Sequence, residues 1–247
     1  MVGLGQMASV LGFGFLRLGR PVVPVTRTMS MATVASEVPS PELVVIAVGE
    51  RELKGVLRDL PDAWRDRVAL LQNELRPSTW QPHALEGPTI LSAWFEKKKG
   101  MDVRVLRASS AFGPGAPLFC SALGAIDVPC TAAAPEDLVH ELARKNLYIL
   151  TVNIAGLIID VSVGVLWKQH RRTVDEVFED LFRLEERLLG TSLDRAEQER
   201  SLAESIEAAP ERRARGRTAA ERLARVLDQA QTLNLSLPSL SEIPSNT

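Results

Sequence analysis

The sequence predicts an α/β domain over residues 1–130 followed by an all-helical domain over residues 131–247. Two apolar runs, residues 43–48 and 68–72, have the pattern of strands buried on both faces of a parallel sheet. From Pro135 onward, apolar residues instead recur at helical spacing. A chain of 247 residues is long enough to bury a core in each part.

Residues 1–27 have the layout of a dinucleotide-binding βαβ unit, which makes the α/β domain Rossmann-type. A glycine turn is followed by an apolar helix-like run and a short Val/Pro strand. Gly3 permits a tight turn, Gly5 lets the backbone approach a pyrophosphate, and small Ala8 lets the helix pack closely on the sheet. The helix N-terminus offers free N–H groups to the phosphates. The predicted cofactor-binding turn comprises Gly3, Leu4, Gly5, Gln6, Met7 and Ala8.

Two further residues stand where this kind of domain contacts its ligands. Arg27 ends the second strand, where an acidic residue would bond the ribose 2′-hydroxyl of NAD. Arginine suits the 2′-phosphate, so NADP is the expected cofactor. Asn73 follows the run at 68–72, and ligands of open α/β sheets bind beyond the carboxyl ends of the strands. We therefore expect Asn73 to contact cofactor or substrate.

The beginning of the sequence leaves two alternatives open. A first strand usually has about five residues, but only Met1 and Val2 precede Gly3. The strand is therefore truncated, or the true N-terminus lies upstream. Alternatively, residues 1–36 contain three arginines and no acidic residue, the composition of a transit peptide for a mitochondrion or plastid. That interpretation does not explain where the glycines fall, so a cytoplasmic, nucleotide-binding protein is preferred.

Composition argues against several other classes of function. The net charge of −2 disfavours a nucleic-acid partner. Cys120 and Cys130 lack metal-site spacing and the three histidines are far apart, so neither a metal site nor a disulfide framework is expected. Residues 147–167 resemble a membrane span, but Asn153 and Asp160 interrupt them. A buried core helix is therefore expected there, with no membrane partner.

The rest of the chain yields several local predictions. Residues 89–95 and 103–107 are expected to form a hairpin that turns at Gly100, and residues 112–117 to form a loop. Residues 136–167 predict one long helix or two. Capping boxes at 173–176 and 218–221 predict two helix starts, and Gly190 predicts a helix end.

With both halves placed, the sequence resembles the ketopantoate reductase family, within the wider group that has 6-phosphogluconate-dehydrogenase-like helical domains. The glycine turn and Arg27 match the NADP site of the family, and Asn73 matches its strand-end asparagine. Residues 141–153 match its first interdomain helix. The resemblance implies that Lys145 is the catalytic lysine, which protonates a ketone oxygen, and that Asn153 orients the substrate. Residues eight apart are separated by about 80° around a helix, so both can border one cleft.

Three departures from the family pattern weaken the assignment of its known substrate. Ile149 replaces an asparagine, and no glutamate stands in register before Glu221. A strand-end lysine is replaced around Gly49 and Glu50. The leading hypothesis is an NADP-dependent reductase of a small 2-oxo acid or ketone, a homodimer being one possible assembly. The alternative is a non-catalytic dinucleotide-binding or scaffolding protein, in which Lys145 is a solvated helix residue and Asn153 a satisfied core amide.

Overall fold

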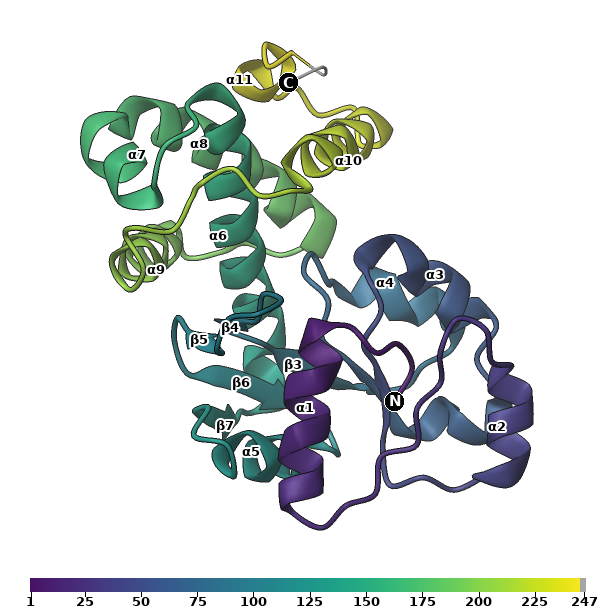
Figure 1. Ribbon diagram of the computed structural model, residues 1–247. Coiled ribbons are helices and arrows are strands. Elements are labelled where there is room, and N and C mark those ends of the chain that lie inside the picture. The colour runs from purple at the N-terminus through teal and green to yellow at the C-terminus, as the bar shows by residue number, and fades with distance from the viewer. Residues whose placement is uncertain (245–247) are drawn as a thin grey trace. The chain divides into compact units, whose positions relative to one another are not determined.

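The structure, a computed structural model, describes residues 1–244. The chain divides into two compact units, Met1–Leu142 and Ala143–Thr247. The first unit contains a five-stranded sheet in the order β1-β2-β3-β6-β7 (Figure 1). Its strands are β1 (Val44–Ile46), β2 (Val68–Leu70), β3 (Thr89–Ser92), β6 (Ser109–Phe112) and β7 (Cys130–Ala132). The predicted buried strands are thus confirmed, since every residue of β1 and β2 is buried.

The strands of this sheet are mostly parallel. β1, β2 and β3 pair in parallel, β6 is antiparallel to β3, and β7 is parallel to β6. The segment at Val2 extends this arrangement beyond β1. Val2 bridges in parallel to Ile46 on one side and to Val25 on the other. This segment, called the stub strand below, therefore lies between β1 and the segment around Val25.

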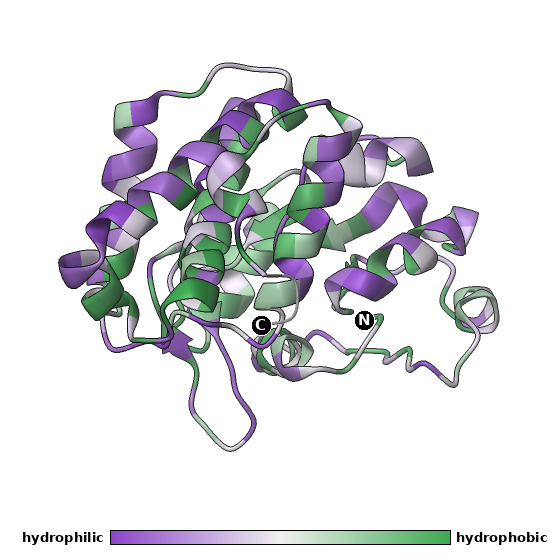
Figure 2. Cartoon of the chain, turned by 90° about the horizontal axis from the view of Figure 1, so that it is seen from above, coloured by the Kyte–Doolittle hydropathy of each residue, from purple (hydrophilic) through white to green (hydrophobic). Residues whose placement is uncertain are grey.

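Helices cover both faces of the sheet, as continuous apolar strands require. One core cluster joins the sheet to α1 (Gln6–Arg17) and α5 (Ala116–Gly124). The other joins it to α2 (Met31–Glu37) and α3 (Glu50–Arg58), and it also contains Trp64 and Trp80. The remaining helices of this unit are α4 (Pro77–Trp80) and the short 3-10 helices at Asp62–Arg67, Gln81–His83 and Pro135–Asp137. Many helices in Figure 2 carry both hydrophobic and hydrophilic residues, as expected where one side is buried.

The predicted hairpin forms only near its turn, because residues 89–92 are β3 of the five-stranded sheet and pair with β6 instead. The loop after it is shorter than expected. β4 (Phe95–Glu96) pairs antiparallel with β5 (Arg104–Val105), and Gly100 has a φ of 76° in the turn. The expectation that residues 112–117 form only a loop was wrong, because Phe112 ends β6 and Ala116 begins α5. Pro117 lies in the first turn of α5, where its missing N–H has no helical acceptor to lose.

The second unit is helical in its described residues, which confirms the expected fold class. α6 (Leu138–Ile158) begins before the boundary and continues through it. The helices α7 (Val163–Gln169), α8 (Arg171–Leu189), α9 (Arg195–Glu207), α10 (Ala219–Thr232) and α11 (Pro238–Ser241) follow. The apolar run at 147–167 is divided between α6 and α7. Within residues 1–244 no helix has both the length and the apolar character that crossing a membrane requires.

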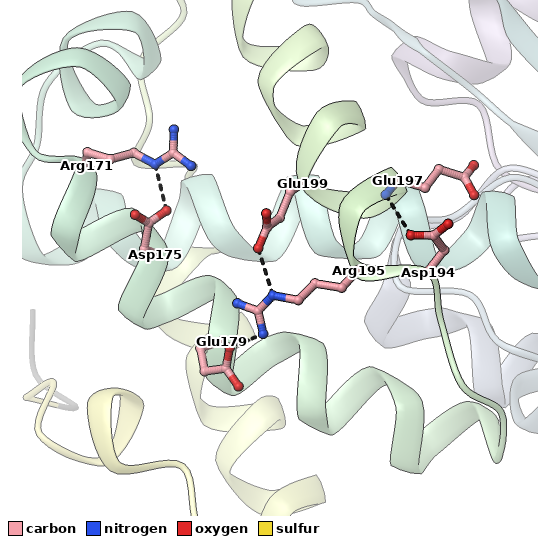
Figure 3. Close-up of polar contacts among 7 residues, drawn as sticks. All are labelled: Arg171, Asp175, Glu179, Asp194, Arg195, Glu197 and Glu199. Atoms are coloured by element: carbon pink, nitrogen blue, oxygen red, sulfur yellow. Dashed lines mark hydrogen bonds and ion pairs between the residues drawn. The ribbon is translucent and has the colours of Figure 1, made fainter.

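Ion pairs connect α8 and α9 on their solvent-exposed sides. The Arg195 guanidinium lies 2.5 Å from Glu179 Oε2 of α8 and 2.8 Å from Glu199 Oε1 of its own helix (Figure 3). The Asp194 carboxylate accepts the Glu197 N–H at 3.1 Å and so caps α9. Such exposed pairs contribute about 0.2–1 kcal/mol each. The predicted end of α8 at left-handed Gly190 is confirmed, whereas the capping box at 173–176 is not formed because α8 begins at Arg171.

Candidate functional site

The turn between the stub strand and α1 lies at the carboxyl edge of the sheet and can be built only with glycine at its first position. Gly3 has a φ of 87°, and a Cβ on it would lie 2.8 Å from the Ala47 carbonyl oxygen. Its N–H donates to the Val25 carbonyl at 2.9 Å. The backbone therefore leaves the sheet tightly between two neighbouring strand ends, as a phosphate-binding turn requires.

The N-terminus of α1 has no anionic group of its own. Gly5 is its N-cap, no side chain caps the helix, and its first turn holds no acidic residue. A Cβ on Gly5 would meet no atom within 4 Å, so the space beside this N-cap residue is open. The first turn of α3, by contrast, contains Glu50 and Glu52. The α1 terminus thus offers free N–H donors and a positive dipole end to a phosphate, and its geometry fits a dinucleotide pyrophosphate.

Small residues bring α1 close to its neighbours. Ala8 is buried, with an exposed fraction of 3%. Two turns further along, a Cβ on Gly14 would overlap the backbone of Ala122 in α5. Sequence reasoning identified the first contact but not the second, because the approach of α5 depends on a segment more than a hundred residues away.

Arg27 is exposed near the end of the segment that pairs with the stub strand. No hydrogen bond or ion pair joins its side chain to another described residue. Arg20, in comparison, has its guanidinium 3.4 Å from the Glu42 carboxylate. Arg27 therefore remains available to an anionic ligand.

Asn73 lies half-buried just beyond β2, where the sequence predicted it. Its side-chain amide donates to Glu50 Oε1 at 3.1 Å. The preceding residue, Gln72, donates to the Ile46 carbonyl at 2.7 Å and to the Val48 carbonyl at 3.1 Å, which joins the ends of β1 and β2. The partnership of Asn73 with Glu50 was not predicted. The one signal for it in the sequence is the replacement of the family lysine around Gly49 and Glu50.

The two predicted residues of the second unit, Lys145 and Asn153, lie on α6 and are both 3% exposed. Lys145 has interaction partners and is not a solvated surface residue. The Asn153 side-chain oxygen accepts a hydrogen bond from the Arg222 guanidinium at 3.2 Å, and Gly216 packs directly against it. Asn153 thus already has a donor within its own unit. Ile149, on the same helix, is buried.

A buried carboxylate in the first unit escaped sequence reasoning. Glu141 Oε1 accepts hydrogen bonds from Ser92 Oγ at 2.7 Å and from Trp94 Nε1 at 2.6 Å. Ser92 and Trp94 lie 49 and 47 residues before Glu141, so no local sequence pattern predicts the contact. Glu141 precedes Lys145 by four residues, which is about one turn of α6.

Solved structures with this architecture cover almost the whole chain. Against a ketopantoate reductase from Ralstonia eutropha the TM-score is 0.69 at 14% identity, with 98% of this chain and 96% of that chain covered. The chain has the ketopantoate reductase fold. D-mandelate dehydrogenase in complex with NADH gives 0.68 at 13% identity, with 98% and 95% covered. The dimeric ketopantoate reductase from Staphylococcus aureus gives 0.68 at 13%, with 98% and 94% covered.

Sequence comparisons alone do not reveal this relationship. No protein-family model matches the sequence, and no curated protein matches it. The ketopantoate reductase fold is therefore kept at identities where residue-by-residue equivalence is not established. Each site residue has to be judged by its own surroundings.

The described residues contain neither a metal-binding cluster nor a disulfide bond. Within residues 1–244, no group of three or more His, Cys, Asp and Glu side chains could hold a metal ion. Cys120 and Cys130 are free thiols with sulfur atoms 3.4 Å apart. Burial, together with the neighbouring Cys120, raises the pKa of the Cys130 thiol, which keeps it protonated at neutral pH.

Proposed function

We propose that this protein is an NADPH-dependent reductase that acts on a small 2-oxo acid or ketone. One observation carries the proposal, namely the uncapped N-terminus of α1 behind Gly3 and Gly5 in a chain with the ketopantoate reductase fold. A protein of the same fold, D-mandelate dehydrogenase, has been solved with NADH, which supports a nicotinamide cofactor.

The first unit supplies the groups that hold this cofactor. The N–H groups at the start of α1 bind its pyrophosphate, and the exposed Arg27 pairs with the 2′-phosphate. The cofactor, once bound, supplies the hydride. Asn73 orients bound ligand, and Glu50 fixes the rotation of its amide by accepting one of its two N–H bonds.

Lys145 is the proton donor in this proposal. A buried ammonium can give a proton to a ketone oxygen as negative charge develops there, which lowers the barrier to reduction. Asn153 keeps the substrate in place through its amide, with Arg222 setting the orientation of that amide. These roles follow from the family resemblance and from residue chemistry together.

Gly5 allows a sharp test of the cofactor site. An aspartate is a favourable N-cap residue, so Gly5→Asp should preserve or raise stability. Its carboxylate would occupy the open space before α1 and repel a phosphate. We expect the parent protein to bind NADPH in a fluorescence titration and to oxidise it with at least one member of a panel of 2-oxo acids. The Gly5→Asp variant should fold and bind no NADPH.

A matched control is Gly12→Ala on the same helix, where an added Cβ meets no atom within 4 Å and should leave NADPH binding unchanged. Equal NADPH affinity in the Gly5→Asp variant would show that the cofactor does not bind at α1. Absence of NADPH binding by the parent would overturn the proposal as a whole.

A second candidate function is a dinucleotide-binding protein without catalysis. Three observations favour it: Glu50 holds Asn73, Arg222 holds Asn153, and Ile149 places an apolar side chain where the family has an amide. Saturable NADPH binding without oxidation by any compound of the panel would support this candidate. Turnover with one compound would exclude it.

We also propose that the protein forms a homodimer, as is stated for the Staphylococcus aureus ketopantoate reductase. Light scattering after size-exclusion chromatography would test this directly, because the chain has a mass of 27.0 kDa. A single species of that mass at micromolar concentration would contradict it.

A further inference from the structure

The first unit contains two cysteines whose sulfur atoms lie next to each other. Cys120 belongs to α5 and Cys130 begins β7, and Figure 1 shows α5 beside β7. The two Sγ atoms are 3.4 Å apart, and both thiols are free. The sequence contains no other cysteine. Because a disulfide bond is about 2.0 Å long, the sulfur atoms need to approach each other by only about 1.4 Å to form one.

The connection between α5 and β7 holds the two thiols at this separation. The Val128 N–H donates to the Leu123 carbonyl at 3.0 Å, and the Ser109 N–H of β6 donates to the Pro129 carbonyl at 2.9 Å. Between these bonds Asp127 has a φ of 57°, a left-handed conformation that aspartate adopts more readily than most residues. The short distance between the thiols therefore follows from the hydrogen-bonded backbone that leads from one to the other.

Both thiols are half-buried, at the margin of the core. Their side chains pack against the core cluster that joins the sheet to α1 and α5. β7 is the last strand in the order of the sheet, and its residues Thr131 and Ala132 are exposed. Ser121, which follows Cys120 in α5, is exposed as well. A molecule as small as hydrogen peroxide therefore has access to the pair.

Their surroundings give the two thiols different roles. Burial, and in second place the hydrogen bond and charge of Cys120, raises the pKa of the Cys130 thiol. Cys130 therefore keeps its proton, and Cys120 is the sulfur that attacks an oxidant as a thiolate. Once Cys120 is oxidised, its negative charge no longer opposes the ionisation of Cys130. A reactive thiol beside a second thiol that resolves its oxidised form is the arrangement of redox-sensitive cysteines.

We propose that Cys120 and Cys130 form a reversible disulfide when the protein reacts with hydrogen peroxide, with Cys120 as the attacking thiol. The Cys120 thiolate attacks one peroxide oxygen and the O–O bond breaks. Cys120 becomes a sulfenic acid, and the other oxygen leaves as hydroxide, which the proton released by Cys120 converts to water.

Cys130 then closes the reaction. Its sulfur attacks the Cys120 sulfur, the S–O bond of the sulfenic acid breaks, and the departing hydroxide takes the Cys130 proton. Altogether two thiols and one hydrogen peroxide give one disulfide and two molecules of water, and two electrons pass from the sulfur atoms to the peroxide.

The disulfide has two consequences for the first unit. It protects Cys120 from further oxidation to the sulfinic and sulfonic acids, which thiols do not reverse. It also joins α5 covalently to β7 and closes the loop 120–130, which restricts the unfolded chain. The proposal does not rest on the proposed reductase function, because neither cysteine belongs to the cofactor-binding turn or to α6.

Mass spectrometry of the intact full chain tests the proposal. Reduced protein is treated with excess hydrogen peroxide, and the remaining thiols are then alkylated with N-ethylmaleimide. We expect the parent to lose the mass of two hydrogen atoms, to take up no N-ethylmaleimide, and to regain two alkylatable thiols after treatment with dithiothreitol. A disulfide between two chains, irreversible oxidation of either cysteine, or two thiols that stay alkylatable would overturn the proposal.

Single variants separate the two roles. Cys130→Ser removes the resolving thiol, so the sulfenic acid of Cys120 should be trapped by dimedone and, without dimedone, be oxidised further. Cys120→Ser leaves only the buried Cys130 thiol, and its labelling by dimedone after peroxide should be lower by about tenfold or more. Alanine in place of serine serves at either position if circular dichroism shows that a variant has unfolded. Equal labelling of the two variants would contradict the role of Cys120.

A displaced thiol is the control for geometry. The double variant Cys120→Ser/Ser121→Cys keeps the number of thiols and brings them one residue closer along the chain. The position of Ser121, however, is exposed and lies about 100° around α5 from that of Cys120. We expect this variant to form no disulfide within the chain under conditions that convert the parent. An equal yield would show that the cross-link depends on the short loop and not on the packing of α5 against β7, which would overturn the proposal.

Discussion

Arg27 decides which nicotinamide cofactor the protein prefers in the proposed function. A charge-assisted pair with a 2′-phosphate contributes about 1.5–3 kcal/mol, which corresponds to roughly tenfold or more in affinity. We therefore predict that NADPH binds more tightly than NADH and that Arg27→Ala removes most of the difference. Fluorescence titration with each cofactor measures it. Arg20→Ala is the control, because Arg20 is paired with Glu42 and should matter less. Equal affinities in the parent protein would contradict the assignment.

Lys145 is the residue on which catalysis depends in the proposed function. Lys145→Ala should lower kcat by roughly 10²–10⁴-fold, the range for a lost general acid, while NADPH affinity stays nearly unchanged. Lys145→Arg should not restore activity, because a guanidinium does not readily release its proton. Steady-state kinetics beside NADPH titration separates these effects. If Lys145 has only a structural role, Lys145→Ala will lower the melting temperature and leave kcat as it was.

Asn153 provides a comparison on the same helix. Asn153→Ala should mainly raise KM, since its proposed role is orientation of the substrate. It also removes the acceptor of the buried Arg222 guanidinium, so some loss of stability accompanies it. A lower melting temperature without a change in KM would identify Asn153 as a purely structural amide.

At the scale of elements, two glycines of α1 with different surroundings make a matched pair. A Cβ on Gly14 would overlap Ala122 of α5, so Gly14→Ala should destabilise the protein by about 1–3 kcal/mol through strain. A Cβ on Gly12 meets nothing within 4 Å, so Gly12→Ala should stabilise the helix by about 0.5–1 kcal/mol. Urea denaturation of both variants measures the difference. A destabilisation of the same size in both would show that α1 does not contact α5 as described.

The strands and long helices could be predicted because the burial of one or both of their faces gives consecutive residues a recognisable spacing of apolar side chains. β1, β2 and the hairpin at Gly100 carry such patterns, and so does α8 up to Gly190. The short α2 has no comparable period and went unpredicted, although Ser30 caps it. At 218–221 the helix does begin after Thr218, but the Thr218 side chain makes no capping bond.

For the candidate site, the sequence predicted the element on which each residue lies but not the hydrogen-bond partners of its side chain. Sequence placed Gly3, Asn73 and Lys145 correctly at a turn, a strand end and a long helix. It missed the pairing of Asn73 with Glu50 and of Asn153 with Arg222, which are 23 and 69 residues apart. Such pairs depend on how elements far apart in the sequence pack against each other, and no pattern of neighbouring residues predicts that packing.

At the scale of the whole chain, Asp180 connects α8 to the last described helix. Its buried carboxylate accepts the Leu240 N–H at 3.1 Å. Burial raises its pKa above the ordinary value, although hydrogen bonds from Leu240 and Ser239 and the charge of Arg183 act in the opposite direction. The folded state therefore prefers the protonated acid, and the free energy of unfolding decreases as the pH rises through the raised pKa.

This direction predicts the behaviour of Asp180→Asn. The amide stays neutral at every pH and can still accept the Leu240 N–H, so the variant should melt at a higher temperature than the parent at pH 7. The advantage should shrink as the pH falls and vanish below the ordinary aspartate value near 4. Thermal unfolding followed by circular dichroism between pH 4 and 7 measures it. An advantage that is constant with pH would mean that Asp180 is not destabilised by its charge.

The continuity of α6 across Leu142 has an evolutionary consequence. The chain passes from one unit to the other inside a helix rather than through a loop. One inserted residue there would rotate every later position of α6, Lys145 and Asn153 included, by about 100° relative to its first turn. An insertion of seven residues would leave an offset of only about 20°. Insertions in surface loops can therefore have any length during evolution. Insertions in α6 keep Lys145 and Asn153 facing the same way only when their length is close to a whole number of helical turns.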